Sequence, residues 1–195
     1  MSDVSDFSEN PVDEVATRAL ARFAGLIRRI DWFGRVATPL DPPTRRMARR
    51  YLDTLGFPDI VPAWVEDWLD AAAAAESLDY NSPAWDAEEA LRAELVATAE
   101  ALLGEAALAA LLQPVEAVTA TVAGEAASMA AARLGVDDEA FLTAAVGGAV
   151  QAAHLAALVL IAGEDAEDHP FFHKFRLFEA GRWPLGIAGA SFNLF

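Results

Sequence analysis

The feature that most constrains the fold is the segment 140–163, in which only three side chains are polar: Thr143, Gln151 and His154. At 100° per residue these three residues and Gly147 fall within one narrow stripe of a helix. A helix that is apolar on every other side has to be buried. The segment therefore predicts a central apolar helix, with a single histidine directed to one side of it.

The alanine content extends this prediction to half of the chain. Residues 71–163 contain 33 alanines in 93 positions, and β-branched residues are few, which favours helix over strand. A length of 195 residues with 54% hydrophobic content suits one globular domain with an ample core. We expect an all-α, single-domain bundle of about seven helices around 140–163.

Capping and breaking residues predict where these helices begin and end. A capping side chain precedes proline at Asn10, Asp41, Ser82 and His169, as is typical of helix starts. Pro114 is expected to interrupt the apolar periodicity of the segment 105–134, which lies between Gly104 and Gly135. The predicted helices are 10–33, 41–55, 62–77, 82–104, 105–112, 114–134, 140–163 (capped by Asp137) and 169–180.

Charge divides the chain into unequal parts. After a flexible acidic N-terminus, 1–9, we expect a basic helical hairpin over 10–56, an acidic alanine-rich bundle over 57–180 and a C-terminal loop over 181–195. Between Arg18 and Arg50 lie nine basic and two acidic residues, whereas 57–195 carries 5 basic and 22 acidic ones. With a formal net charge of -16, the protein is expected to repel nucleic acids and anionic membranes.

The length of 140–163 would also suit a membrane span. Acidic clusters flank both of its ends, Lys and Arg anchors are missing there, and much of it is weakly hydrophobic alanine and glycine, which favours a soluble bundle. The chain contains no cysteine, which excludes disulfides, thiolate metal sites and iron–sulfur clusters. The acidic N-terminus lacks the pattern of a secretory signal, so we expect a cytoplasmic protein.

The polar stripe on the central helix, formed by Thr143, Gly147, Gln151 and His154, is the first candidate site. A buried imidazole needs hydrogen-bond partners, so His154 is either a satisfied core histidine or a ligand contact. Adjacent glycines at 147 and 148 cost helix propensity, which indicates either a cavity beside the stripe or close packing of a neighbouring helix.

The C-terminal loop is a second candidate, because Arg182 and Trp183 precede a proline and a glycine in a shape-specific turn. We expect these two residues either to bind a ligand or to hold the loop on the core. The apolar end, formed by Phe192, Leu194 and Phe195, is expected to strap across the domain or to dock into a partner.

Two weaker patterns remain. Arg45, Arg46, Arg49 and Arg50 share one face of the helix 41–55 and would suit an anion or an acidic partner. The other interpretation is a solvated face, on which Asp53 pairs with Arg49. His169 and His173 have the spacing of two metal ligands, although a structural role as a helix cap competes with that interpretation.

The sequence contains no nucleophile elbow, phosphate-binding glycine loop, dinucleotide fingerprint or zinc-protease motif. It therefore favours a non-enzymatic helical protein that binds a partner protein or a small apolar ligand near His154. The sequence implies no cofactor. A homodimer is also compatible with it, because helix faces rich in alanine and glycine can pack against a second copy of the chain. The alternative is an enzyme or sensor, with or without a metal, in which His154 works with Glu94, Glu116 or Glu125. On its own, the excess of arginine over lysine, thirteen to one, indicates no mechanism.

Overall fold

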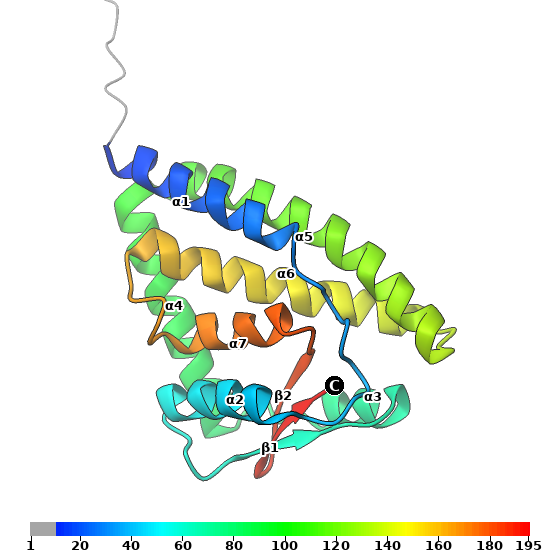
Figure 1. Ribbon diagram of the computed structural model, residues 1–195. Helices are drawn as coiled ribbons and strands as arrows, with labels where there is room; N and C mark the ends of the chain where they lie inside the picture. Colours follow the sequence, from blue (N-terminus) through cyan, green and yellow to red (C-terminus); the bar gives the residue numbers. More distant parts are fainter. Residues whose placement is uncertain (1–10) are drawn as a thin grey trace, which may run out of the picture.

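The computed structural model describes residues 11–195, and the predicted flexible segment 1–9 lies outside them. Over this part of the chain the predicted all-α bundle is confirmed, with a small three-stranded sheet added to seven helices (Figure 1). The elements are α1 (Pro11–Ile27), α2 (Pro42–Leu55), β1 (Val61–Trp64), α3 (Trp68–Glu76), α4 (Pro83–Leu103), α5 (Glu105–Leu134), α6 (Glu139–Ala162), α7 (Pro170–Glu179), β2 (Pro184–Ala188) and β3 (Ser191–Leu194).

Helix α6 is the predicted central helix, and it packs against α1, α4, α5 and α7. In Figure 1 it runs between α1 and α5 on one side and α7 on the other. Its last three turns are almost wholly buried, from Ala152 to Ile161, because apolar side chains surround the helix there. The N-cap is Asp138, whose carboxylate accepts from the backbone N–H of Ala140 at 2.8 Å, and not the predicted Asp137.

Pro114 does not end a helix, because α5 is continuous from Glu105 to Leu134. Leu108, Leu112, Val115 and Thr119 are all buried, so the helical periodicity of the core-facing side passes through the proline. A proline inside a helix costs about 3 kcal/mol. The extensive packing of α5 on α6 offsets that cost. The predicted break was wrong.

The expected basic hairpin over 10–56 does not form. Helix α1 packs on α5 and α6, whereas α2 packs on α7 and β1, at opposite ends of the molecule in Figure 1. Helix α1 also ends at Ile27 and not at Phe33, because Trp32 and Phe33 turn into the core. Phe33 and Ala37 both adopt positive φ angles in the connection that follows.

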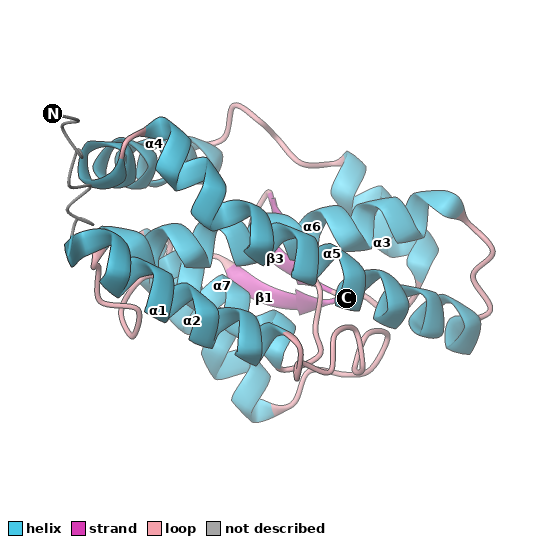
Figure 2. Cartoon of the chain, turned by 90° about the horizontal axis from the view of Figure 1, so that it is seen from above, coloured by secondary structure: helices cyan, strands magenta, loops and turns pink. Residues whose placement is uncertain are grey.

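A sheet replaces the start of the predicted helix 62–77 and most of the loop 181–195. Strand β3 lies in the middle, parallel to β1 and antiparallel to β2. Phe192 of β3 is paired with Pro62 of β1 on one side and with Ile187 of β2 on the other. Seen from above in Figure 2, β1 and β3 lie beneath the helices. The N–H groups of Trp183 and Phe195 each donate to the other residue's carbonyl at 2.9 Å. The C-terminus therefore straps across its own domain, as a strand pair rather than an irregular loop.

This sheet and α2 enclose a second, smaller core beside the one around α6. Leu52, Leu177, Phe192 and Leu194 have no exposed surface in it. Helix α7 contributes to both cores, through Phe175 on the α6 side and Leu177 on the α2 side. The C-terminal segment 181–195, which we call the strap, therefore connects the α2 end of the molecule to the central helix.

Two helices within residues 11–195 are long and apolar enough to cross a membrane by length and composition, namely α5 and α6. The core helix of a soluble protein meets the same criterion. In each helix we consider the 18-residue window that meets the criterion. In α6, 56% of that window is buried inside the fold, and in α5 28% is buried.

Candidate functional site

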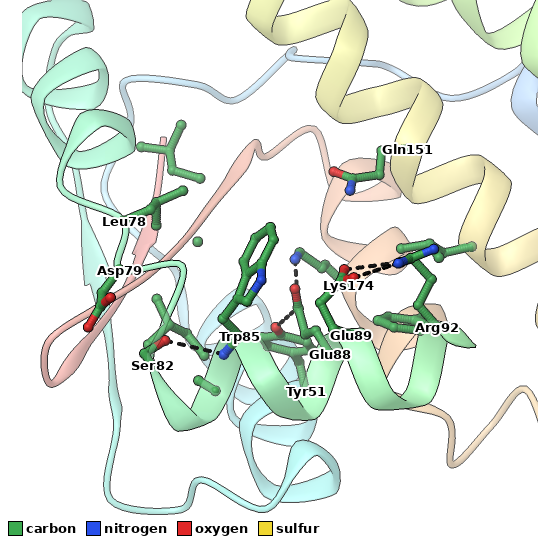
Figure 3. A pocket seen from close by; sticks show the side chains of 16 residues that line it. Tyr51, Leu78, Asp79, Ser82, Trp85, Glu88, Glu89, Arg92, Gln151 and Lys174 are labelled. Atoms are coloured by element: carbon green, nitrogen blue, oxygen red, sulfur yellow. Dashed lines mark hydrogen bonds and ion pairs between the residues drawn. The ribbon is translucent and has the colours of Figure 1, made fainter. Parts of the chain in front are cut away.

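Two adjoining cavities, both partly open to solvent, lie beside α6, α7 and β2, with α4 bordering the first and α3 the second. The first has a volume of about 110 Å³ and the second of about 170 Å³. Gln151, Leu155, Lys174 and Leu185 line both of them, so the two cavities are neighbouring lobes of one site. Figure 3 shows the first lobe, with Gln151 of α6 on one side and the side chains of α4 on the other.

A charged cluster lies at the wall of the first lobe. The Nζ of Lys174 on α7 is 2.7 Å from Oε1 of Glu88 on α4. The hydroxyl of Tyr51 on α2 donates to the same carboxylate oxygen (Figure 3). The side chains of Lys174 and Glu88 are only 19% and 18% exposed. Lys174 Nζ also lies 5.5 Å from the centre of the Tyr51 ring, so the three groups form one compact unit.

Local sequence places Glu88 in this position. The Ser82 hydroxyl accepts from the N–H of Trp85 and caps α4, whose first turn also contains Pro83. Trp85, Glu88 and Arg92 then follow at spacings of three and four residues, which puts them on one face of the helix. This face lines the first lobe, with the Trp85 ring packed edge-on against Tyr80.

The electrostatics of the cluster keep Tyr51 protonated. Burial, and then the neighbouring Glu88 carboxylate, raise the pKa of Tyr51 well above its usual range. Tyr51 therefore remains a hydrogen-bond donor at physiological pH. On the rim, Arg92 donates three hydrogen bonds to Glu89 and lowers the pKa of that carboxyl. Each cation of the first lobe thus has its own carboxylate partner.

The second lobe explains one of the two adjacent glycines in α6. A β-carbon at Gly148 would lie 3.2 Å from Nε1 of Trp183, so the indole packs directly on the helix backbone. A β-carbon at Gly147 would meet no atom within 4 Å. Of the two expected reasons for the glycines, close packing therefore applies at Gly148, where the neighbour is an indole rather than a helix, whereas Gly147 is open.

The predicted stripe separates in the structure. Gln151 lines both lobes, but Thr143 and Gly147 are exposed and His154 lines neither lobe. His154 instead makes a contact of 2.7 Å from Nδ1 to the carboxylate of Glu116 on α5. Their side chains are 33% and 41% exposed. The structure therefore brings together one of the predicted histidine–carboxylate pairs, away from the cavities.

Arg182 does not face a ligand, because it is wholly buried. Its guanidinium donates to the carbonyl oxygens of Arg35, Thr38 and Pro39 and so holds the connection between α1 and α2. Trp183 is buried too, stacked on Trp68 at 5.8 Å, although one edge of its ring reaches the second lobe. Of the two loop candidates, only Trp183 lines a cavity.

The four arginines of α2 do not form one free face. Arg49 donates to the carbonyl oxygens of Pro58 and Ile60 and not to Asp53, which corrects the predicted pair. Arg45 donates to the carbonyl of Leu40, and Arg46 and Arg50 are exposed. Two of the four guanidinium groups are therefore used to fix the chain on either side of α2.

His169 and His173 have separate structural positions. The imidazole of His169 caps α7 by accepting from the N–H of Phe171 at 3.1 Å, whereas His173 is buried inside the helix packing. Within residues 11–195, no three His, Asp or Glu side chains are placed together to hold a metal ion. The cap, rather than a ligand pair, explains the spacing.

These two histidines predict a loss of stability in mild acid. Burial lowers the pKa of both histidines. At His169 the charges of Glu164 and Glu94 raise the pKa but do not cancel the effect of burial. At His173 the charges of Arg176 and Arg50 lower the pKa further, and that of Asp168 raises it. The unfolded chain then binds protons that the folded chain does not. The free energy of unfolding should be highest above pH 6.5 and fall as the pH drops below it, by at most about 1.4 kcal/mol per pH unit for each histidine.

Urea unfolding at several pH values between 7.5 and 5 measures this slope. His169→Asn keeps a capping acceptor but does not titrate, so it should flatten the slope. A slope unchanged in this variant would contradict the assignment to His169.

Comparison of the chain with protein-family models, with curated proteins and with solved structures finds no match. The charged cluster of the first lobe was not predicted from the sequence. One signal could have indicated it, since Lys174 is the single lysine among fourteen basic residues.

Proposed function

We propose that this protein binds a small, neutral, mainly apolar molecule in the two adjoining lobes, with a hydrogen-bond acceptor of that molecule placed at Lys174. The observation that carries the proposal is the position of Lys174, which lines both lobes and is largely shielded from solvent. Among residues 11–195 its Nζ makes one hydrogen bond, to Glu88. An ammonium group has three donors, so two remain for a ligand.

The charges of the lining favour a neutral ligand. Glu88 neutralises Lys174 and Glu89 neutralises Arg92, so neither cation is available as a counter-ion for an anionic head group. The net charge of -16 further disfavours anions. A carbonyl or hydroxyl oxygen would still gain a charge-assisted hydrogen bond from Lys174.

Size and apolar surface define the rest of the ligand. A cavity of about 150 Å³ holds a benzene molecule, which is the scale of each lobe. Trp85, Leu155 and Phe171 supply apolar surface in the first lobe, and Phe178 and Trp183 in the second. Half of the residues that line the first lobe are polar or charged, whereas the second lobe is mainly apolar. An apolar surface with polar groups at one end is typical of small-molecule sites. One planar ring with a short polar substituent would suit such a lobe.

Binding of acetophenone and of ethylbenzene, measured by isothermal titration calorimetry, tests this proposal. The two probes have nearly the same shape, and only acetophenone has an acceptor oxygen. A hydrogen bond to a charged donor contributes about 1.5–3 kcal/mol, so acetophenone should bind about 10- to 100-fold more tightly. Equal affinities, or no binding of either probe, would contradict the proposal.

Gln151→Phe places a bulky side chain where the two lobes meet and should weaken acetophenone binding at least about tenfold. The matched control is Gln113→Phe, since Gln113 is an exposed glutamine of α5 that lines neither lobe. If both variants lose the same affinity, the ligand binds elsewhere.

A further inference from the structure

We propose that Lys174 condenses with an aldehyde or ketone in the first lobe to form an imine, and that Glu88 takes and returns the proton. The inference rests on the proposed function, because the carbonyl compound must first bind there. It assigns to the site a chemical reaction in addition to binding.

The residue type is the first argument. The other thirteen basic residues are all arginine, which forms the stronger, two-pronged pair with a carboxylate. An arginine at position 174 could therefore hold Glu88 if only an ion pair were needed. An ammonium group can release a proton and become a nucleophile, which a guanidinium group does not do in proteins. The single lysine thus supplies the reactivity that arginine lacks.

The position of Lys174 is the second argument. Its side chain is largely shielded from solvent and lines both lobes, and its Nζ lies at hydrogen-bond distance from the carboxylate of Glu88, whose side chain is shielded to the same extent. A carboxylate at this distance stabilises the ammonium form, and it is also the acceptor for the proton that the nitrogen must lose before it can attack a carbonyl carbon. Tyr51 holds this carboxylate in place, because its hydroxyl donates to Glu88.

The reaction balances with these groups alone. The ammonium of Lys174 passes one proton to Glu88, and the resulting amine attacks the carbonyl carbon to form a C–N bond. A second proton moves from nitrogen to the former carbonyl oxygen, which gives a carbinolamine. Glu88 returns its proton to that hydroxyl, the C–O bond breaks and water leaves, while the nitrogen lone pair forms the C=N bond. The products are a protonated imine, the Glu88 carboxylate and one water molecule, with no change of oxidation state.

Reductive trapping with benzaldehyde and sodium cyanoborohydride tests the proposal. The hydride reduces an imine to a stable benzyl amine, which peptide mapping by mass spectrometry locates either at Lys174 or at the N-terminal amine. The full-length protein unfolded in urea has the same single lysine and provides the reference rate. We expect trapping at Lys174 in the folded protein to be at least about tenfold faster than in the unfolded one.

Three variants separate the roles. Lys174→Arg keeps a cation beside Glu88 and should abolish the adduct while circular dichroism remains unchanged. Glu88→Gln should slow trapping by about 100-fold, the lower range for general acid–base catalysis. Glu100→Gln is the matched control, since Glu100 is exposed on the same helix and lines neither lobe, and its trapping rate should equal that of the wild type.

The outcomes also distinguish this inference from the proposed function. If acetophenone binds but benzaldehyde modifies Lys174 no faster than in the unfolded chain, the imine is excluded and the binding site stands. An equal loss of rate in Glu88→Gln and Glu100→Gln would overturn the role of Glu88. If neither probe binds and no adduct forms, both proposals fail together.

Discussion

Deleting Phe192 to Phe195 is expected to leave the chain unfolded at 25 °C. Phe192, Leu194 and Phe195 have no exposed surface, and each large apolar side chain removed from a core costs about 2–5 kcal/mol. The deletion also removes the middle strand of the sheet and the paired hydrogen bonds between Trp183 and Phe195. Together these losses equal or exceed the 5–15 kcal/mol by which a domain is ordinarily stable. Circular dichroism and thermal unfolding measure the result.

A matched pair of leucines makes the same test with less disruption. Leu194→Ala should lower the free energy of unfolding by about 2–5 kcal/mol. Leu69→Ala, at a position that is 80% exposed on α3, should change it by no more than about 0.5 kcal/mol. If the deleted chain melts like the full-length protein, the strap is not part of the core and is available to a partner.

Replacing Arg182 by leucine is expected to cost about 3–5 kcal/mol of stability. The guanidinium is wholly buried, and it is the donor for three backbone carbonyls in the segment that connects α1 to α2. Hydrogen bonds from a charged donor contribute about 1.5–3 kcal/mol each, and the carbonyls left behind regain part of that from water. The segment contains two non-glycine residues at positive φ, so it depends on contacts elsewhere to keep its shape.

Urea unfolding of Arg182→Leu, with Arg46→Leu as the control, measures this cost. Arg46 is exposed on α2, and its replacement should change stability by no more than about 0.5 kcal/mol. Hydrogen exchange should localise the effect of Arg182→Leu to residues 28–41 before the rest of the domain responds. Equal stabilities of the two variants would show that the carbonyl contacts do not hold the connection.

Several elements of the fold could be predicted because their signals are local. Asp41, Ser82 and His169 each cap a helix by accepting a backbone N–H two or three residues further on, so the sequence pattern and the interaction coincide. The segment 140–163 is similarly self-sufficient, since a helix apolar on nearly all sides is stable in water only inside other elements.

The same local reasoning failed where distant elements decide the conformation. Pro114 reads as a break, yet packing on α6 keeps α5 continuous across it. The strands β1 and β3 are only four residues each, and neither has a reason to be extended until the other lies beside it. The sequence left open whether Arg182 binds a ligand or holds the loop on the core, because it does not reveal that carbonyl groups more than 140 residues away surround this side chain.

By itself, the sequence determined the helical class, most of the helix ends and the burial of α6, since these follow from contacts between residues two to four positions apart. Only the tertiary structure decided the candidate site. Tyr51 and Glu88 are 37 residues apart, and Glu88 and Lys174 are 86 apart, and they meet because α2, α4 and α7 pack around one cavity. A cavity forms where the surfaces of separate elements fail to fill the space between them, and no periodicity within a single element contains that information.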